Sequence, residues 1–267
     1  VSVGGECRES GTSPAVTFPL GRCYDRRTGM TVTEAELTTY ANSHDIINLG
    51  VAADEVRRRL HGARTTFVRL ADLSARPGDP VDVPAAAGEV RVVGAPVSRE
   101  AAVQRVQEVL AAARGVAVSA FSLHDLEALA SREQVTLRTL LEDLRRAGLE
   151  LIAEAAFDRL REPRLAIEEV NIAGLTLARL TIHQLPSADA PELYRRVSAL
   201  QYEVGVVRAF APLPRAVNPA VPTTGYDDVR RVALARLFVP NVPTIQVDWA
   251  LYGPKLAQVA LTVGADD

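Results

Sequence analysis

Three titratable side chains in this 267-residue chain could carry acid and base chemistry: Asp125, Asp158 and His183. Each follows closely on a short apolar run that we expect to form a strand. A carboxyl group and an imidazole in one cavity, with separated pKa values, can act as general acid and general base. Structural roles are the alternatives: Asp125 can begin a helix, and Asp158 can pair with Arg159 or Arg161. A structural role for His183 is equally open.

Two glutamines could bind a small molecule. Gln184 follows His183 at the end of an expected strand, where a slip of one residue reverses the face of each side chain. Gln246 shares the last expected strand with Trp249, at an odd spacing that points the two side chains to opposite faces. We therefore expect Gln246 to bind substrate and Trp249 to lie in the core.

Lys255 and Gln258 lie one turn apart on the last expected helix. Both are candidates for substrate binding, because Lys255 could hold a carboxylate of a small molecule. The alternative is a surface ion pair between Lys255 and Glu192. The sequence leaves both open.

Other reactive residues lack the partners that their chemistry needs. His44, His61 and His124 have no cysteine or carboxylate at metal-ligand spacing, so we expect no metal site. Ser119 and Ser122 lack the G-x-S-x-G elbow of a hydrolase triad.

The cysteines are Cys7 and Cys23, and both fall in an irregular leader over residues 1–30. A disulfide, a transient metal contact and no role at all are open for them, and we favour the last.

Composition excludes several classes of protein. With 48% hydrophobic and 24% charged residues the chain is expected to be globular, and a net charge of -3 gives no basic face for nucleic acid. Arg57 to Arg59 lie near Asp54 and Glu55 and indicate a solvated helix face. No apolar run reaches the roughly 20 residues of a membrane span, and residues 1–28 lack a secretory signal. We expect a cytoplasmic protein.

Strands alternate with helices along most of the chain. Helical patterns over residues 31–61 form a lead-in, and a loop rich in Pro, Asp and Ala covers 74–88. No G-x-G-x-x-G or P-loop pattern occurs, so a partial or modified (β/α) barrel is preferred to a dinucleotide-binding sheet. We expect one domain over 31–267. Its strands are expected at 65–70, 89–94, 116–121, 149–153, 177–182, 205–210 and 244–249, with helices at 98–114, 123–147, 191–202, 226–238 and 254–263.

Two stretches of the chain resemble a known family. They are residues 44–62, beginning His-Asp-Ile-Ile-Asn-Leu-Gly, and 232–267, which includes Gly-Pro-Lys-Leu-Ala-Gln at 253–258. They resemble the aminofutalosine synthases and dehypoxanthine futalosine cyclases of the futalosine route to menaquinone, which are also similar to deazaflavin synthase subunits. The resemblance covers roughly 31–267. It implies a radical S-adenosylmethionine barrel, a four-iron four-sulfur cluster and S-adenosylmethionine as cofactors.

The departures from this family concern its cofactors. Relatives follow their first strand with C-x-x-x-C-x-x-C, whose thiolates hold the cluster, whereas this chain has Arg69 to Ser74 and a Pro-rich loop there. Glu154 to Ala156 replace a glycine-rich turn that lets the backbone approach S-adenosylmethionine. We therefore expect both cofactors to be lost. The resemblance also matches Asp125 and Asp158 to acidic residues of relatives.

Two classes of function follow, with loss of any selected function as a third possibility. The first is a pseudoenzyme linked to menaquinone biosynthesis, which binds a small molecule or pairs with an active paralogue in a homo- or hetero-oligomer. The alternative is a non-radical lyase, isomerase or cyclase that acts on a futalosine-like or carboxylated aromatic substrate through Asp125, Asp158 and His183. Convergence of these three side chains favours the enzyme. A barrel mouth filled by Glu154, Phe157 and the Pro-rich loop favours the binding protein.

Overall fold

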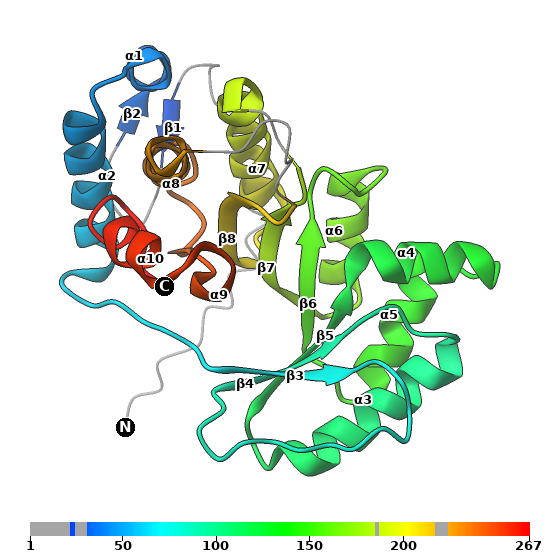
Figure 1. The fold of residues 1–267 in the computed structure, drawn as a ribbon. Helices are drawn as coiled ribbons and strands as arrows, with labels where there is room; N and C mark the ends of the chain where they lie inside the picture. The colour runs from blue at the N-terminus through cyan, green and yellow to red at the C-terminus, as the bar shows by residue number, and fades with distance from the viewer. Residues whose placement is uncertain (1–21, 25–30, 185–186, 217–223) are drawn as a thin grey trace, which may run out of the picture.

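A curved, parallel seven-stranded sheet forms the centre of the molecule (Figure 1). The computed structural model describes residues 22–24, 31–184, 187–216 and 224–267. Strand order follows chain order from β3 to β9, and the sheet is open between these two edge strands. This arrangement is a partial (β/α) barrel, as the sequence predicts. Its strands are β3 (Leu70–Ser74), β4 (Glu89–Val93), β5 (Ala117–Ser122), β6 (Leu151–Ala156), β7 (Thr176–Ile182), β8 (Val207–Pro214) and β9 (Thr244–Ile245).

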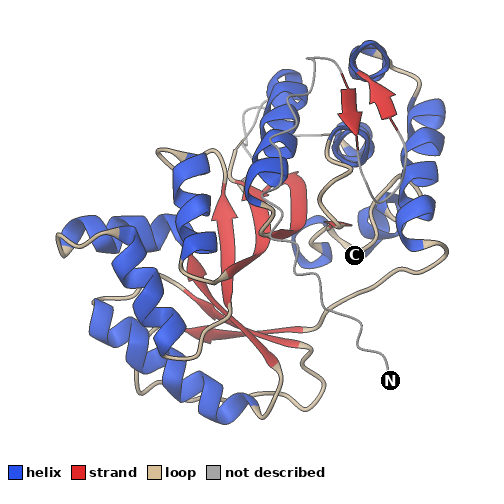
Figure 2. Ribbon diagram, turned by 180° about the vertical axis from the view of Figure 1, so that it is seen from behind, coloured by secondary structure: helices blue, strands red, loops and turns tan. Residues whose placement is uncertain are grey.

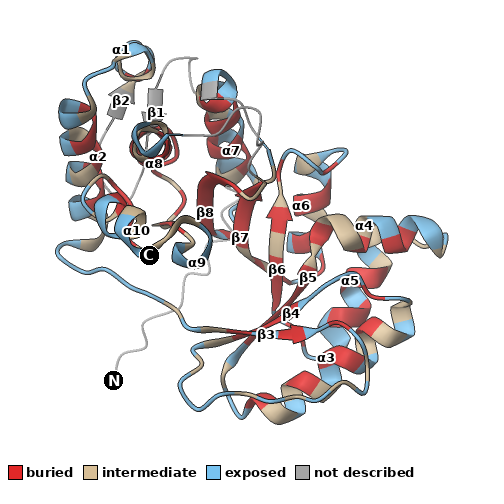
Figure 3. Cartoon of the chain, in the orientation of Figure 1, coloured by how far each residue is buried: buried red, intermediate tan, exposed pale blue. Residues whose placement is uncertain are grey.

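Helices pack along the outside of this sheet (Figure 2). They are α3 (Arg99–Ala113), α4 (Leu123–Arg132), α5 (Leu137–Arg146), α6 (Pro163–Ile172), α7 (Ala190–Val204) and α8 (Gly225–Phe238), with a short 3-10 helix, η1 (Ser187–Asp189), before α7. Local sequence sets their starts, since the Ser98 hydroxyl caps α3 and the Thr224 hydroxyl caps α8. Their apolar faces meet those of the strands, and the buried residues gather there (Figure 3).

The N-terminal part forms a separate layer beside α8. The antiparallel strands β1 (Arg22–Tyr24) and β2 (Thr31–Thr33) precede α1 (Glu34–Asn42) and α2 (Ile46–His61), and α2 packs on α8. Thr33 and Glu36 form a capping box at α1. The expected helical lead-in is present, and β1 lies within the segment that the sequence suggested to be irregular.

Four expected strands have bounds that differ by two residues or more, namely those that became β3, β6, β8 and β9, and the first and the last of them matter for the site. The first begins at Leu70 rather than at residue 65, because the Thr66 N–H donates to the carbonyl of Asp266 (2.8 Å), outside the sheet. The last strand ends at Ile245, because the Asp248 carboxylate accepts hydrogen bonds from the N–H groups of Ala250 and Leu251 and thereby starts a helix. That helix is α9 (Trp249–Tyr252), and α10 (Pro254–Ala260) follows it.

The basic run at the end of α2 is only partly solvated. Arg57 is 6% exposed and its Nε donates to Asp54 (2.7 Å), so the prediction of a solvated face is wrong for this residue. Arg58 and Arg59 remain exposed. Burial of the Arg57 stem against the core accounts for the difference. In the described part of the chain, the helices are too short or too polar to cross a bilayer.

Candidate functional site

Charged side chains link the strands across the barrel interior. The β3–β4 register places Asp72 opposite Arg91, and the Arg91 Nε and Nη2 donate to the two Asp72 oxygens at 2.8 Å each. Burial opposes the charge of Arg91, but the hydrogen bonds and attraction from Asp72 outweigh it and raise the pKa of Arg91. This bidentate pair fixes Arg91 firmly.

A second pair crosses the interior from β7 to β4. The Arg179 Nη2 donates to the Glu89 Oε1 at 2.9 Å, and the Ser119 hydroxyl donates to the same oxygen. The Arg179 side chain is 5% exposed. Burial lowers the pKa of Arg179 in spite of its attraction to Glu89, so its positive charge is incompletely compensated.

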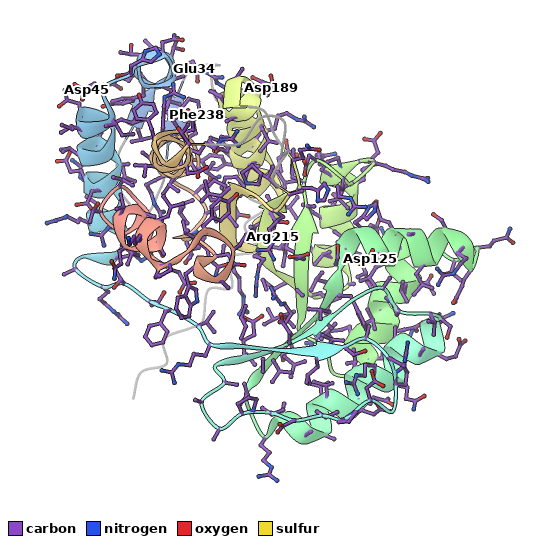
Figure 4. The ribbon with its side chains drawn as sticks, in the orientation of Figure 1. Glu34, Asp45, Asp125, Asp189, Arg215 and Phe238 are labelled. Atoms are coloured by element: carbon purple, nitrogen blue, oxygen red, sulfur yellow. The ribbon has the colours of Figure 1, made fainter. Side chains whose placement is uncertain are left out.

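A third group follows β8. It centres on Arg215, which is labelled in Figure 4. The Arg215 Nη1 donates to the Asp248 Oδ2 at 2.7 Å, and the Arg215 Nη2 lies 3.6 Å from the Glu154 Oε2. Burial acts against the charge of Asp248, but Arg215 and the N–H groups at the start of α9 lower its pKa. Glu154, which the sequence places where relatives have glycine, therefore belongs to an ion-pair network.

A cavity of about 350 Å³, which we call the seam cavity, lies where the sheet is open between β3 and β9. Arg91 and Arg179 line it from within, and Gln246 donates to the Asp267 carboxylate (2.6 Å) at its wall. Trp249 is 63% exposed beside it, so the prediction of a core tryptophan is wrong. The early end of β9 accounts for this. The full lining is Phe67, Val68, Arg69, Leu70, Asp72, Arg91, Arg179, Gln246, Val247, Asp248, Trp249, Ala250 and Asp267.

Asp158 and His183 meet through the main chain. The Asp158 carboxylate accepts hydrogen bonds from the N–H groups of His183 and Gln184, both at 2.7 Å, and so ties the segment after β6 to the end of β7. Asp125 lies in the first turn of α4 (Figure 4). Among the described residues, no hydrogen bond or ion pair joins the Asp125 carboxylate to the Asp158 carboxylate or the His183 imidazole. These hydrogen bonds give Asp158 a structural contact, and an acid and base role for the three residues stays a prediction.

The polar residues of α10 lie elsewhere. Lys255 and Gln258 are exposed, and neither lines the seam cavity. Glu192, the alternative partner of Lys255, contacts Arg195 on its own helix at 3.7 Å. Gln184 is exposed as well. Of the substrate-binding candidates, Gln246 is the one in the seam cavity.

A second cavity, of about 310 Å³, lies between α4 and the segment after β6. The Arg159 Nη2 donates to the Nε2 of His124 at 3.0 Å, and burial raises the pKa of Glu127, one turn further along α4. Sequence reasoning dismissed His124 because it considered metal ligands alone. The spacing of His124 and Glu127, three residues apart on one face of a helix, could have indicated this second cavity.

The donor set after β3 does not fit a four-iron cluster. Residues 75–88 connect β3 to β4 and contain no cysteine, whereas such a cluster needs three thiolates. Cys23 lies on β1, which is beside α1 and α8 and far from the carboxyl end of β3 (Figure 1), and Cys7 lies outside the described residues. Within the described ranges, no group of three His, Cys, Asp or Glu side chains is arranged to hold a metal ion.

Comparison of sequences identifies three informative relatives. The chain is 31% identical over 180 residues to an aminodeoxyfutalosine synthase of Thermus thermophilus, a match that covers 57% of this chain and 48% of that enzyme. It is 25% identical over 293 residues to a 5-amino-6-(D-ribitylamino)uracil--L-tyrosine 4-hydroxyphenyl transferase of Methanosphaerula palustris, covering 88% and 80%. A cyclic dehypoxanthine futalosine synthase of Streptomyces coelicolor is 27% identical over 166 residues, covering 54% and 41%. The chain thus spans about half the length of the two futalosine enzymes. No family model matches it.

Solved structures define the class of fold. Methylornithine synthase (PylB) superposes with a TM-score of 0.61 at 14% identity, covering 89% of this chain and 82% of that one. The FeFe-hydrogenase maturase HydG of Carboxydothermus hydrogenoformans gives 0.57 at 12% identity, covering 86% and 65%. The fold is therefore a partial barrel of the radical S-adenosylmethionine type. By sequence, the chain is related to the radical S-adenosylmethionine enzymes of the futalosine and deazaflavin-type pathways, which confirms the expected resemblance.

Proposed function

We propose that this protein is a cluster-less relative of these enzymes that binds a small molecule without radical chemistry. The donor set after β3 carries the proposal: residues 75–88 offer no thiolate, and the chain has two cysteines in all. Without a cluster, the sulfonium of S-adenosylmethionine has no electron donor for reductive cleavage. The proposed function therefore uses neither S-adenosylmethionine nor the cluster.

The barrel interior supports the same proposal. Asp72 with Arg91, Glu89 with Arg179, and Arg215 with both Asp248 and Glu154 join the strands through ion pairs. Phe157, directly after β6, is 4% exposed, and the Arg196 guanidinium lies 5.1 Å from its ring centre. Because these charged groups pair with one another inside the barrel, they fill the interior in which the relatives would carry out their chemistry. Binding of a ligand at the open seam is therefore favoured.

The link to menaquinone biosynthesis comes from the futalosine relatives alone. It belongs to the proposal, as does pairing with an active paralogue. The alternative of a non-radical lyase, isomerase or cyclase has less support, because the Asp158 carboxylate is engaged by backbone N–H groups.

Anaerobic reconstitution with iron and sulfide tests the proposal. We expect no four-iron absorption and no stoichiometric iron in the purified chain. The Thermus aminodeoxyfutalosine synthase is treated in parallel as the reference sample. S-Adenosylmethionine should also leave the melting temperature unchanged, since a ligand at about 100 times its Kd stabilises a protein by about 2.7 kcal/mol. A stoichiometric cluster, or a saturable thermal shift, would contradict the proposal.

A further inference from the structure

Arg179 has an unusual position among the buried arginines of the barrel. Its side chain is 5% exposed, and it lines the seam cavity. A guanidinium carries five N–H donors, and the one hydrogen bond that the described residues accept from Arg179 goes to Glu89. Arg91, in contrast, is held by both oxygens of Asp72. Arg179 therefore presents unused donors and a poorly compensated charge to the cavity.

The rim of the cavity is aromatic. Phe67 is 79% exposed and Trp249 is 63% exposed, and both line the cavity, one before β3 and one after β9. The Arg69 guanidinium lies 5.9 Å from the centre of the Phe67 ring. Large exposed rings around a polar cavity leave apolar area in water that a flat ligand would cover.

The charges of the lining limit the charge of the ligand. Arg69, Arg91 and Arg179 line the cavity with Asp72, Asp248 and Asp267, so the formal charges of the lining are equal in number. Directly behind the lining, Glu89 pairs with Arg179 and Arg215 pairs with Asp248, which adds one charge of each sign. One negative charge can be placed on Arg179, but a second would face the three carboxylates. A monoanion is therefore favoured over a dianion such as a phosphate ester.

We propose that the seam cavity binds a flat organic monoanion, with the anionic oxygens on Arg179 and the ring against Trp249 and Phe67. The volume of about 350 Å³ accommodates a ring that bears one carboxylate. The proposal names the ligand class for the small-molecule binding proposed above and rests on that function.

Trp249 makes the test direct, because it is the one tryptophan of the chain. Benzoate, benzyl alcohol and phenyl phosphate are titrated against tryptophan fluorescence, with calorimetry as a second readout. Benzoate should change the fluorescence saturably. Benzyl alcohol, which lacks the charge, and phenyl phosphate, which carries more, should each bind at least about tenfold more weakly, equivalent to about 1.4 kcal/mol.

Variants locate the anion. Arg179→Gln should weaken benzoate binding about tenfold or more, whereas Arg208→Gln, an exposed arginine on β8, should leave it unchanged. Because Arg179→Gln leaves Glu89 without its cation, the double variant Glu89→Gln/Arg179→Gln is measured too, with circular dichroism to verify folding. Phe67→Ala, on the exposed rim, should weaken binding several-fold without affecting the fold.

Equal binding of benzoate and benzyl alcohol, or tighter binding of phenyl phosphate, would overturn the monoanion. Unchanged benzoate binding in a folded Arg179 variant would overturn the anchor, as would an equal loss in Arg208→Gln. A folded protein that shows neither a fluorescence change nor heat with benzoate would overturn the site. These outcomes leave the iron and S-adenosylmethionine measurements untouched, so failure of the cavity and failure of the cluster-less function are distinguishable.

Discussion

Arg236 and Arg179 show two ways to bury a guanidinium in one barrel. Arg236, on α8, is fully buried; its Nε donates to the Gly264 carbonyl (2.8 Å), its Nη1 to the Pro243 carbonyl (3.3 Å) and its Nη2 to Asp266. Burial lowers the pKa of Arg236 to about 10, although Asp266 acts against this shift. Arg179 is almost as buried but has one acceptor. The first arginine is satisfied by the protein, and the second leaves donors for something else.

Arg236 also holds Asp266, which connects the two edges of the open sheet. Asp266 accepts the Ile245 N–H at its carboxylate (2.9 Å) and the Thr66 N–H at its carbonyl (2.8 Å), so it bridges the end of β9 and the segment before β3. The His61 Nε2 lies 3.6 Å from the same carboxylate. We call Arg236 with Asp266 the tail lock. It serves stability, whereas the surroundings of Arg179 suit binding.

The largest expected effect breaks the tail lock. Asp266→Ala leaves the Arg236 charge buried without its carboxylate and should cost about 3–5 kcal/mol of unfolding free energy. Glu89→Ala, the matched change at Arg179, should cost about 1–3 kcal/mol, because the cavity can admit water to the freed guanidinium. Urea unfolding of both variants measures the difference. Equal losses would show that the two arginines do not differ as described.

A smaller effect concerns acid stability at the wall of the seam cavity. The lowered pKa of Asp248 means that its stabilising contribution is complete above the ordinary value of about 3.9 and is lost as the pH falls through the lower folded value. Arg215→Gln removes the main group that lowers this pKa. The variant should therefore be less stable at neutral pH by roughly 1 kcal/mol and should lose less on acidification than the wild type. Parallel losses down to pH ~3 would argue against the pair.

The smallest effect is expected on α10, away from both arginines. Lys255 is exposed, so Lys255→Ala should change the unfolding free energy by less than about 0.5 kcal/mol. Leu256, its neighbour, is half-buried against the core and serves as the control, with an expected cost of about 1–2 kcal/mol on truncation to Ala. Thermal unfolding of the two variants is sufficient. If Lys255→Ala also removed benzoate binding, the assignment of the benzoate site to the seam cavity would be wrong.

The sequence predicted the strand and helix alternation because apolar runs between turn residues suffice to define buried parallel strands. It did not predict the end of β9, since the capping carboxylate of Asp248 ended an otherwise β-rich run and turned Trp249 outward. The seam cavity was beyond reach for another reason. Arg91 and its partner Asp72 are 19 residues apart, and Arg179 and Glu89 are 90 apart, so only the folded sheet brings each pair together. Asp158 follows a strand, as its place after an apolar run indicates, but its backbone partners could not be read from spacing.

Gly264 shows what the tail lock demands of sequence change. The residue has φ +112°, and a Cβ added there would lie 2.8 Å from the Cβ of Arg236 and 3.1 Å from the Cβ of Ala53. A side chain at this position would have to displace Arg236 on α8 and Ala53 on α2, and the positive φ would add backbone strain. The combination of arginine at 236, glycine at 264 and aspartate at 266 is thus a three-position fingerprint. A genome search that requires it while forbidding cysteines between the first two barrel strands would separate cluster-less lineages of this kind from cluster-bearing ones.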